Sequence, residues 1–198
     1  RAMNDALSSQ DYLYTLVQLG DQQCEPPQVV GAIHGFQLAP DDQEAVIEKL
    51  ASPEVRIVSL TITEGGYNID DHSDEFNECH PDIQHDLNNP SMPKTMFGFV
   101  TEALQRRQRR NITPFTLMSC DNLPHNGAVA RKALLAFAEL RDPSLKDWIA
   151  EHVSFPNSMV DRITPMTSDD HRHQLLLQHG IEDKWPVVCE PFLQWVLE

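Results

Sequence analysis

Short apolar runs alternate with amphipathic segments along this chain of 198 residues. Runs of strand length, rich in β-branched and other apolar residues, occupy residues 12–17, 29–33, 55–61, 114–118 and 153–160, with more extended chain at 185–188 and 195–198. Apolar residues recur at helical spacing in residues 2–7, 41–50, 94–109, 126–140, 143–152 and 169–178. The pattern therefore predicts repeated alternation of strands and helices, with the first two strands pairing as a hairpin-like extension.

This alternation predicts an α/β fold with a mainly parallel sheet covered by helices on both faces. The carboxyl ends of parallel strands share one edge of a sheet, and open α/β sheets bind their ligands at that edge. One strand-to-helix junction, residues 119–127, is especially dense in polar and helix-breaking residues. We therefore expect a ligand site at this junction.

Three strand ends converge in this interpretation, at residues 61–67, 119–122 and 160–162. Glu64, Asn122 and Asp161 could then line one crevice although they are far apart in the sequence. The simpler alternative is structural: Gly65 and Gly66 form a turn, Asn122 caps a helix, and Asp161 pairs with a cation. The pattern alone leaves both interpretations open.

The residue types at these strand ends suit the interconversion of an alcohol and a carbonyl. The Asn122 amide can donate to a developing alkoxide without adding charge, Glu64 could gate a proton, and Asp161 could accept from a hydroxyl. Cys120 and His125 offer a different chemistry, a thiolate nucleophile with its base. No cysteine protease signature surrounds them, and a cysteine at a buried strand end more often serves as a small hydrophobic residue.

The composition argues against several kinds of partner and favours one cellular compartment. A net charge of -15 opposes binding to nucleic acid or to an anionic membrane surface, and no apolar stretch approaches the roughly 20 residues that span a bilayer. The four cysteines are widely spaced and form no C-x-x-C pair, so neither a zinc ribbon nor a disulfide framework is indicated. A reducing, cytoplasmic location fits best.

The nine histidines do not predict a metal site. The pairs His80/His85 and His171/His173 have spacings of five and two, whereas two ligands on one helix face need a spacing of three or four. The acidic loop from residue 70 to 78 starts like a calcium loop but lacks the required glycine and terminal glutamate. The basic cluster at residues 106–110 is placed at a helix C-terminus, where cations are stabilised.

Four stretches closely resemble the mannitol dehydrogenase family, the polyol-specific long-chain dehydrogenases: residues 57–67, 119–127, 155–165 and 185–192. The resemblance implies a Rossmann-type domain and a zinc-independent, NAD-dependent oxidation of D-mannitol to D-fructose by hydride transfer. By position it makes Asn122 an oxyanion-stabilising residue, Glu64 an active-site residue that influences proton movement, and Asp161 part of the nicotinamide and substrate pocket. Thr61 and Thr63 are further expected contacts of substrate or cofactor.

The resemblance also implies that residues 1–198 are a fragment of the NAD-binding domain, with 185–198 an extended segment leading toward a helical domain. The glycine-rich dinucleotide loop is expected before Arg1 and a catalytic lysine after Glu198, so the fragment alone should be inactive. Two alternatives remain: a hexuronate oxidoreductase of the same family, acting on fructuronate or tagaturonate, and a non-catalytic dinucleotide-binding module. The sequence leaves the oligomeric state and the preference between NAD and NADP open.

Overall fold

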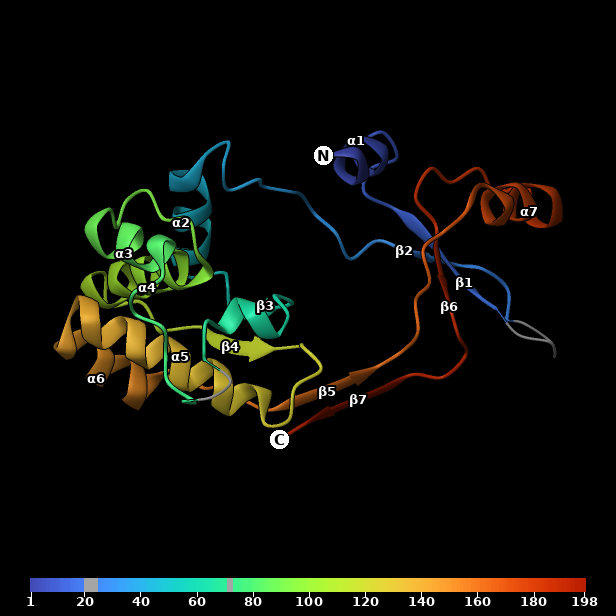
Figure 1. Ribbon diagram of the computed structural model, residues 1–198. Helices are drawn as coiled ribbons and strands as arrows, with labels where there is room; N and C mark the ends of the chain where they lie inside the picture. Colours follow the sequence, from blue (N-terminus) through green and yellow to red (C-terminus); the bar gives the residue numbers. More distant parts are fainter. Residues whose placement is uncertain (20–24, 71–72) are drawn as a thin grey trace. The chain divides into compact units, whose positions relative to one another are not determined.

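The computed structural model describes residues 1–19, 25–70 and 73–198, which divide into two compact units (Figure 1). The first unit contains Arg1–Phe36 and Asp161–Gln194, and the second contains Gln37–Val160 and Trp195–Glu198. Within the described ranges, every helix is too short or too polar to span a bilayer. Residues 20–24, between the first two predicted strands, and residues 71–72 of the acidic loop at 70–78 lie outside the described residues.

The first unit is built on a three-stranded sheet with the order β2-β1-β6. Its elements are α1 (Ala2–Ser8), β1 (Tyr14–Gln18), β2 (Gln28–Val30), α7 (Asp169–His179) and β6 (Val187–Cys189). Strand β1 pairs antiparallel with β2, which confirms the predicted hairpin, and parallel with β6. The buried carboxylate of Asp183 secures this unit by accepting from Thr15 N at 2.5 Å and from Trp185 N at 2.8 Å.

The second unit pairs two parallel strands and packs helices against them (Figure 1). Its elements are α2 (Gln43–Ala51), β3 (Ile57–Leu60), the 3-10 helix η1 (Glu64–Tyr67), α3 (Pro81–Asn88), α4 (Met96–Arg109), β4 (Thr116–Ser119), α5 (Asn126–Arg141) and α6 (Pro143–His152). Strand β5 (Ser158–Asp161) pairs with β7 (Gln194–Leu197); except for Asp161 and Gln194, the residues of both strands belong to the second unit. The α/β class with parallel strand pairs is therefore confirmed.

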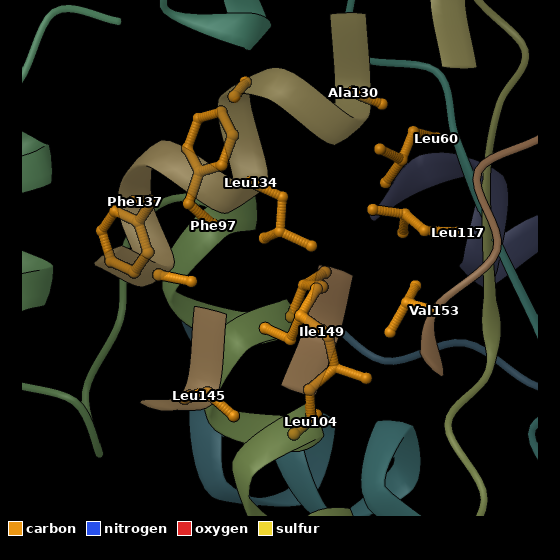
Figure 2. Close-up of a cluster of buried hydrophobic side chains, with 14 of the residues drawn as sticks. Leu60, Phe97, Leu104, Leu117, Ala130, Leu134, Phe137, Leu145, Ile149 and Val153 are labelled. Carbon is orange, nitrogen blue, oxygen red and sulfur yellow. The ribbon is translucent and has the colours of Figure 1, made fainter. Parts of the chain in front are cut away.

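The core of the second unit joins the two strands to the helices. Figure 2 shows Leu60 and Leu117, one from each strand, beside each other near Ala130 and Leu134 of α5. All four side chains are buried, and each large aliphatic side chain buried in this way stabilises the fold by about 1.5–3 kcal/mol. Along β3, Leu60 is buried while Ile57 is exposed. The burial pattern thus directs one side of the β3–β4 pair toward the helices.

Two elements differ from the sequence prediction. The strand predicted at 153–160 begins only at Ser158. Before it, Ser154 O accepts from Leu117 N at 3.0 Å, and Asn157 exchanges two backbone hydrogen bonds with Glu198, at 3.1 and 3.0 Å. Helix α3 was not predicted at all, since its sequence is short and polar. It nevertheless begins with Pro81 at its first position, is capped by the His80 side chain, and buries Ile83.

The basic cluster at the end of α4 includes a fully buried cation, Arg107. Its guanidinium donates to four backbone carbonyls, those of Leu50, Ser52, Val55 and Thr113. The guanidinium carbon also lies 4.8 Å from the centre of a phenylalanine ring in the segment before β4. Burial lowers the pKa of this guanidinium. Arg107 thus joins α4 to the loop that feeds β3, a role beyond the stabilised helix terminus that the sequence indicated.

Replacing Arg107 with methionine should strongly destabilise the protein, because four backbone carbonyl groups would lose the buried guanidinium that donates to them. We expect the free energy of unfolding to fall by about 3 kcal/mol, measured by denaturant unfolding of the full-length protein. The control is Arg109→Met in the same helix turn, where the side chain is exposed. Equal stability of the two variants would contradict the prediction.

Candidate functional site

The candidate site lies where β3 and β4 end. The two strands run parallel with Leu60 opposite Ser119, and Cys120 N donates to Leu60 O at 2.8 Å. The pairing therefore continues one step past the strands, and the loops that follow begin next to each other. This is the edge at which open α/β sheets bind ligands, and the sequence placed two of its three strand ends here correctly.

The carboxylate of Asp121 joins these two loops. One oxygen, Oδ1, accepts from Thr63 N at 2.9 Å, while Oδ2 accepts from Ile62 N at 3.2 Å and from the Tyr67 hydroxyl at 2.6 Å. The sequence interpretation passed over Asp121 and Tyr67. The available signal was only the presence of an acidic residue next to Asn122, and nothing in a linear pattern shows that its partners lie about sixty residues earlier.

Tyr67 carries the contact into the core. Its side chain is buried, and its hydroxyl lies 2.6 Å from Ser119 Oγ at the end of β4. Burial raises the pKa of Tyr67 far above its usual value, and the adjacent Asp121 carboxylate raises it further. The phenol therefore stays protonated at neutral pH and remains a hydrogen-bond donor to Asp121.

Thr63 adopts an unusual backbone conformation in the first loop, with φ 62° and ψ 173°. This region of conformational space is essentially confined to glycine and costs about 1–3 kcal/mol for another residue. Thr63 N donates to Asp121, and Thr63 O accepts from Gly66 N at 3.1 Å. These two bonds hold the strained residue, and η1 with Glu64 at its start follows directly.

The structure exposes four of the predicted site residues: Thr61, Thr63, Glu64 and Asn122. Asn122 has no hydrogen-bond partner among the described residues, and a cavity of about 410 Å³ opens beside it. Residues 121–126, residues 157–160, Val196 and Glu198 line this cavity. Glu64 does not line it; Gly65 and Gly66 border a separate cavity of about 250 Å³.

Asp161 is the last residue of β5 and is exposed. It belongs to the first unit, so Glu64 and Asn122 are the predicted pair that the second unit contains. The expected crevice shared by all three residues therefore stays a prediction.

The structural alternative for Asn122 is wrong, because Asn122 does not cap a helix. Helix α5 begins after His125, whose φ is 53°, and its first N–H groups are capped from another segment. Asn157 Oδ1 accepts from Gly127 N at 3.0 Å and from Ala128 N at 3.4 Å. The Asn122 amide is left available to a ligand.

Asn126 holds the same turn through its buried side chain, and the sequence pattern did not identify it. Its buried amide donates to Asp121 O at 2.9 Å and to Ser158 O at 2.7 Å, and it accepts from Ser158 N at 2.9 Å. Three hydrogen bonds of one side chain thus tie the β4–α5 turn to the start of β5.

The thiol and metal alternatives gain no geometric support. Cys120 and His125, both within the described residues, share no hydrogen bond. Among residues 1–19, 25–70 and 73–198, no three His, Cys, Asp or Glu side chains gather in a way that could hold a metal ion. His80 and His171 each use Nδ1 to accept a backbone N–H at a helix start.

The second unit has a parallel strand pair with polar residues and a cavity at the carboxyl ends of its strands. This arrangement is typical of α/β domains that bind ligands. All 198 residues match the family described as the mannitol dehydrogenase Rossmann domain, and the chain belongs to this family. The family suggested by the sequence is thereby confirmed.

Related proteins extend well beyond this chain. It is 51% identical to a mannitol 2-dehydrogenase of Pyricularia oryzae over 100% of its own length and 39% of that protein. It is 52% identical to a mannitol 2-dehydrogenase of Aspergillus clavatus, covering 99% of this chain and 39% of the relative. The chain thus spans about two fifths of the length of the curated relatives it matches.

Two solved structures are also similar. A ternary complex of Pseudomonas fluorescens mannitol 2-dehydrogenase with NAD and D-mannitol has 63% identity and a TM-score of 0.96, over 100% of this chain and 40% of that one. A substrate-free D-sorbitol dehydrogenase has 47% identity and a TM-score of 0.92, over 98% and 40%. The first of these matches covers the whole of this chain, so it includes the segments that carry the candidate site.

Replacing Gly127 with alanine should destabilise the protein, although this change in a helix usually stabilises by about 1 kcal/mol. An added Cβ would lie 2.6 Å from Phe155 O and closer still to Pro156 O, and these backbone atoms can move only with the loop. We expect a loss of about 2 kcal/mol in the free energy of unfolding. Ala128→Ser, at an exposed position of the same turn, is the control; stabilisation by Gly127→Ala would refute this packing.

Proposed function

We propose that the full-length protein containing this chain oxidises D-mannitol to D-fructose, with NAD as the hydride acceptor. One observation in this structure carries the proposal: Asn122, whose amide has no partner among the described residues, borders a cavity at the carboxyl edge of β4. The relatives named mannitol 2-dehydrogenase and the complex with NAD and D-mannitol support the choice of substrate and cofactor.

The cavity beside Asn122 suits a nicotinamide ring and an uncharged polyol better than a phosphate. Leu123, Met159, Val160 and Val196 give it apolar walls, and Asn122 adds an uncharged donor. At the adjacent start of α5, Asn157 already accepts from two N–H groups, those of Gly127 and Ala128, which weakens this helix start as an anion site. We place the phosphate contacts in the part of the protein outside these 198 residues.

In this proposal Asn122 donates to the substrate oxygen as that oxygen gains negative charge. A fixed donor at the position of a developing alkoxide stabilises the transition state more than the neutral alcohol. Because the amide is neutral, it does so without binding a ground-state anion. When bound, NAD supplies the hydride acceptor, and the hydroxyl proton leaves to a base that we place, from the family resemblance, in the lysine beyond Glu198.

The other predicted residues keep supporting roles in the proposal. Glu64 is exposed at the start of η1, where a carboxylate can take up or release the proton that leaves the site. Thr61 and Thr63 offer exposed hydroxyl groups on the same loop, and Asp161 offers a carboxylate to a substrate hydroxyl. A cytoplasmic location is part of the same proposal and is supported by four widely spaced cysteines.

Replacing Asn122 with alanine in the full-length protein should lower kcat for mannitol by about 100-fold, because one oxyanion donor is lost. Binding of NADH, measured by fluorescence titration, should change little. Asn88→Ala provides the control, since Asn88 is an exposed asparagine in α3 whose amide donates to Gln84 O within its own helix. Wild-type turnover retained in Asn122→Ala would remove the proposed role of this amide.

The choice of substrate is tested on the wild-type full-length protein. Oxidation by NAD is measured with D-mannitol and with D-sorbitol, and reduction by NADH is measured with fructuronate. Mannitol should give the highest kcat/KM. Preference for sorbitol would redirect the proposal to the other hexitol, in line with the similar D-sorbitol dehydrogenase. Preference for fructuronate would support the hexuronate alternative, and binding of NADH without any turnover would support the non-catalytic one.

A further inference from the structure

We infer that Asp121 is the positioning residue of the candidate site: its carboxylate sets the loop that carries Glu64 against the turn that carries Asn122. The inference deepens the proposed function and rests on it. Asp121 is not proposed to touch substrate or cofactor. Its effect on turnover passes through the geometry of the two loops.

The hydrogen bonds of Asp121 leave little room for another role. Both carboxylate oxygens already accept donors, two from the backbone of residues 62 and 63 and one from the buried Tyr67 hydroxyl. Both oxygens therefore accept from groups in the loop after β3, and a carboxylate with these bonds is a poor candidate for a general base. It is well suited to hold Thr63 in its strained conformation.

The main chain of Asp121 is held just as firmly, on the side of β4 and α5. Its N–H donates to Ser119 Oγ at 3.3 Å, and its carbonyl oxygen accepts from Leu123 N and from Asn126 Nδ2, both at 2.9 Å. The backbone of Asp121 therefore belongs to one loop and its side chain to the other. Asn122, the next residue, therefore follows a residue that is held by hydrogen bonds to both loops.

A matched residue in the same unit separates positioning from plain stability. Asp86 is a buried carboxylate that also accepts two backbone N–H groups and one hydroxyl. It accepts from Lys94 N at 2.8 Å, Thr95 N at 2.8 Å and Thr95 Oγ1 at 2.7 Å, and His85 Nδ1 also lies 3.1 Å from Oδ1. These bonds organise the connection between α3 and α4 instead of the loops after the strands.

The test compares Asp121→Asn with Asp86→Asn in the full-length protein. In each variant an amide NH2 replaces one carboxylate oxygen. This NH2 faces a hydrogen-bond donor and cannot accept from it. We expect both variants to lose thermal stability. Only Asp121→Asn should lose kcat for mannitol, by at least about tenfold, because a small misplacement of site groups is enough to slow the chemistry. Its KM for mannitol should change less than its kcat.

A second readout does not depend on turnover. Hydrogen exchange followed by mass spectrometry should show faster exchange in peptides covering residues 57–67 of Asp121→Asn, but not of Asp86→Asn. Should Asp121→Asn fail to fold, Tyr67→Phe takes its place, because it removes one donor and keeps the two backbone bonds. Tyr67→Phe should show the same changes to a smaller degree.

The results separate this inference from the proposed function. A wild-type protein without activity on any polyol would overturn the proposed function and the inference that rests on it. An active wild-type protein whose Asp121→Asn variant matches Asp86→Asn in kcat per folded molecule would overturn the inference alone. Unchanged exchange in residues 57–67 of Asp121→Asn would also overturn it.

Discussion

The parallel pairing of β3 with β4 is the constraint on which the candidate site depends. Because Leu60 lies opposite Ser119, the two strands end at the same level and on the same edge of the sheet. The loops that follow have only a few residues in which to approach a ligand. Asp121 uses this closeness, since a side chain of two carbon atoms reaches the backbone of the neighbouring loop only when the strands end in register.

The turn after β4 is held at its other end by the asparagines around α5. Asn126 bonds across to β5, and Asn157 caps the first N–H groups of the helix. Between these anchors and Asp121 lies a short exposed stretch that includes Asn122 and His125. A ligand group placed there meets side chains whose backbone cannot easily move away. Such fixed donors need little reorganisation when charge develops on a bound oxygen.

The sequence predicted most of this framework because the framework is periodic. Apolar runs marked β3 and β4, helical spacing marked α4 to α6, and Asn122 emerged as an exposed polar residue at a strand end. Helix α3 was missed because Ile83 and Leu87 are the two aliphatic residues in a short helix that is otherwise mostly polar. Asp121 and Asn126 escaped for a different reason: their roles depend on partners far away in the sequence, and no local pattern reveals which carboxylate or amide will be satisfied.

The division of labour between Asp121 and Asn122 follows from charge. An alkoxide forming at this edge would be repelled by a free carboxylate nearby, and these 198 residues already carry a net charge of -15. Asp121 directs its charge to two backbone N–H groups and to Tyr67, whose raised pKa keeps it a donor. The adjacent position is then left to a neutral amide. The charged residue fixes the backbone, and in the proposed function the uncharged residue would meet the substrate oxygen, so the anchoring bonds need not oppose that chemistry.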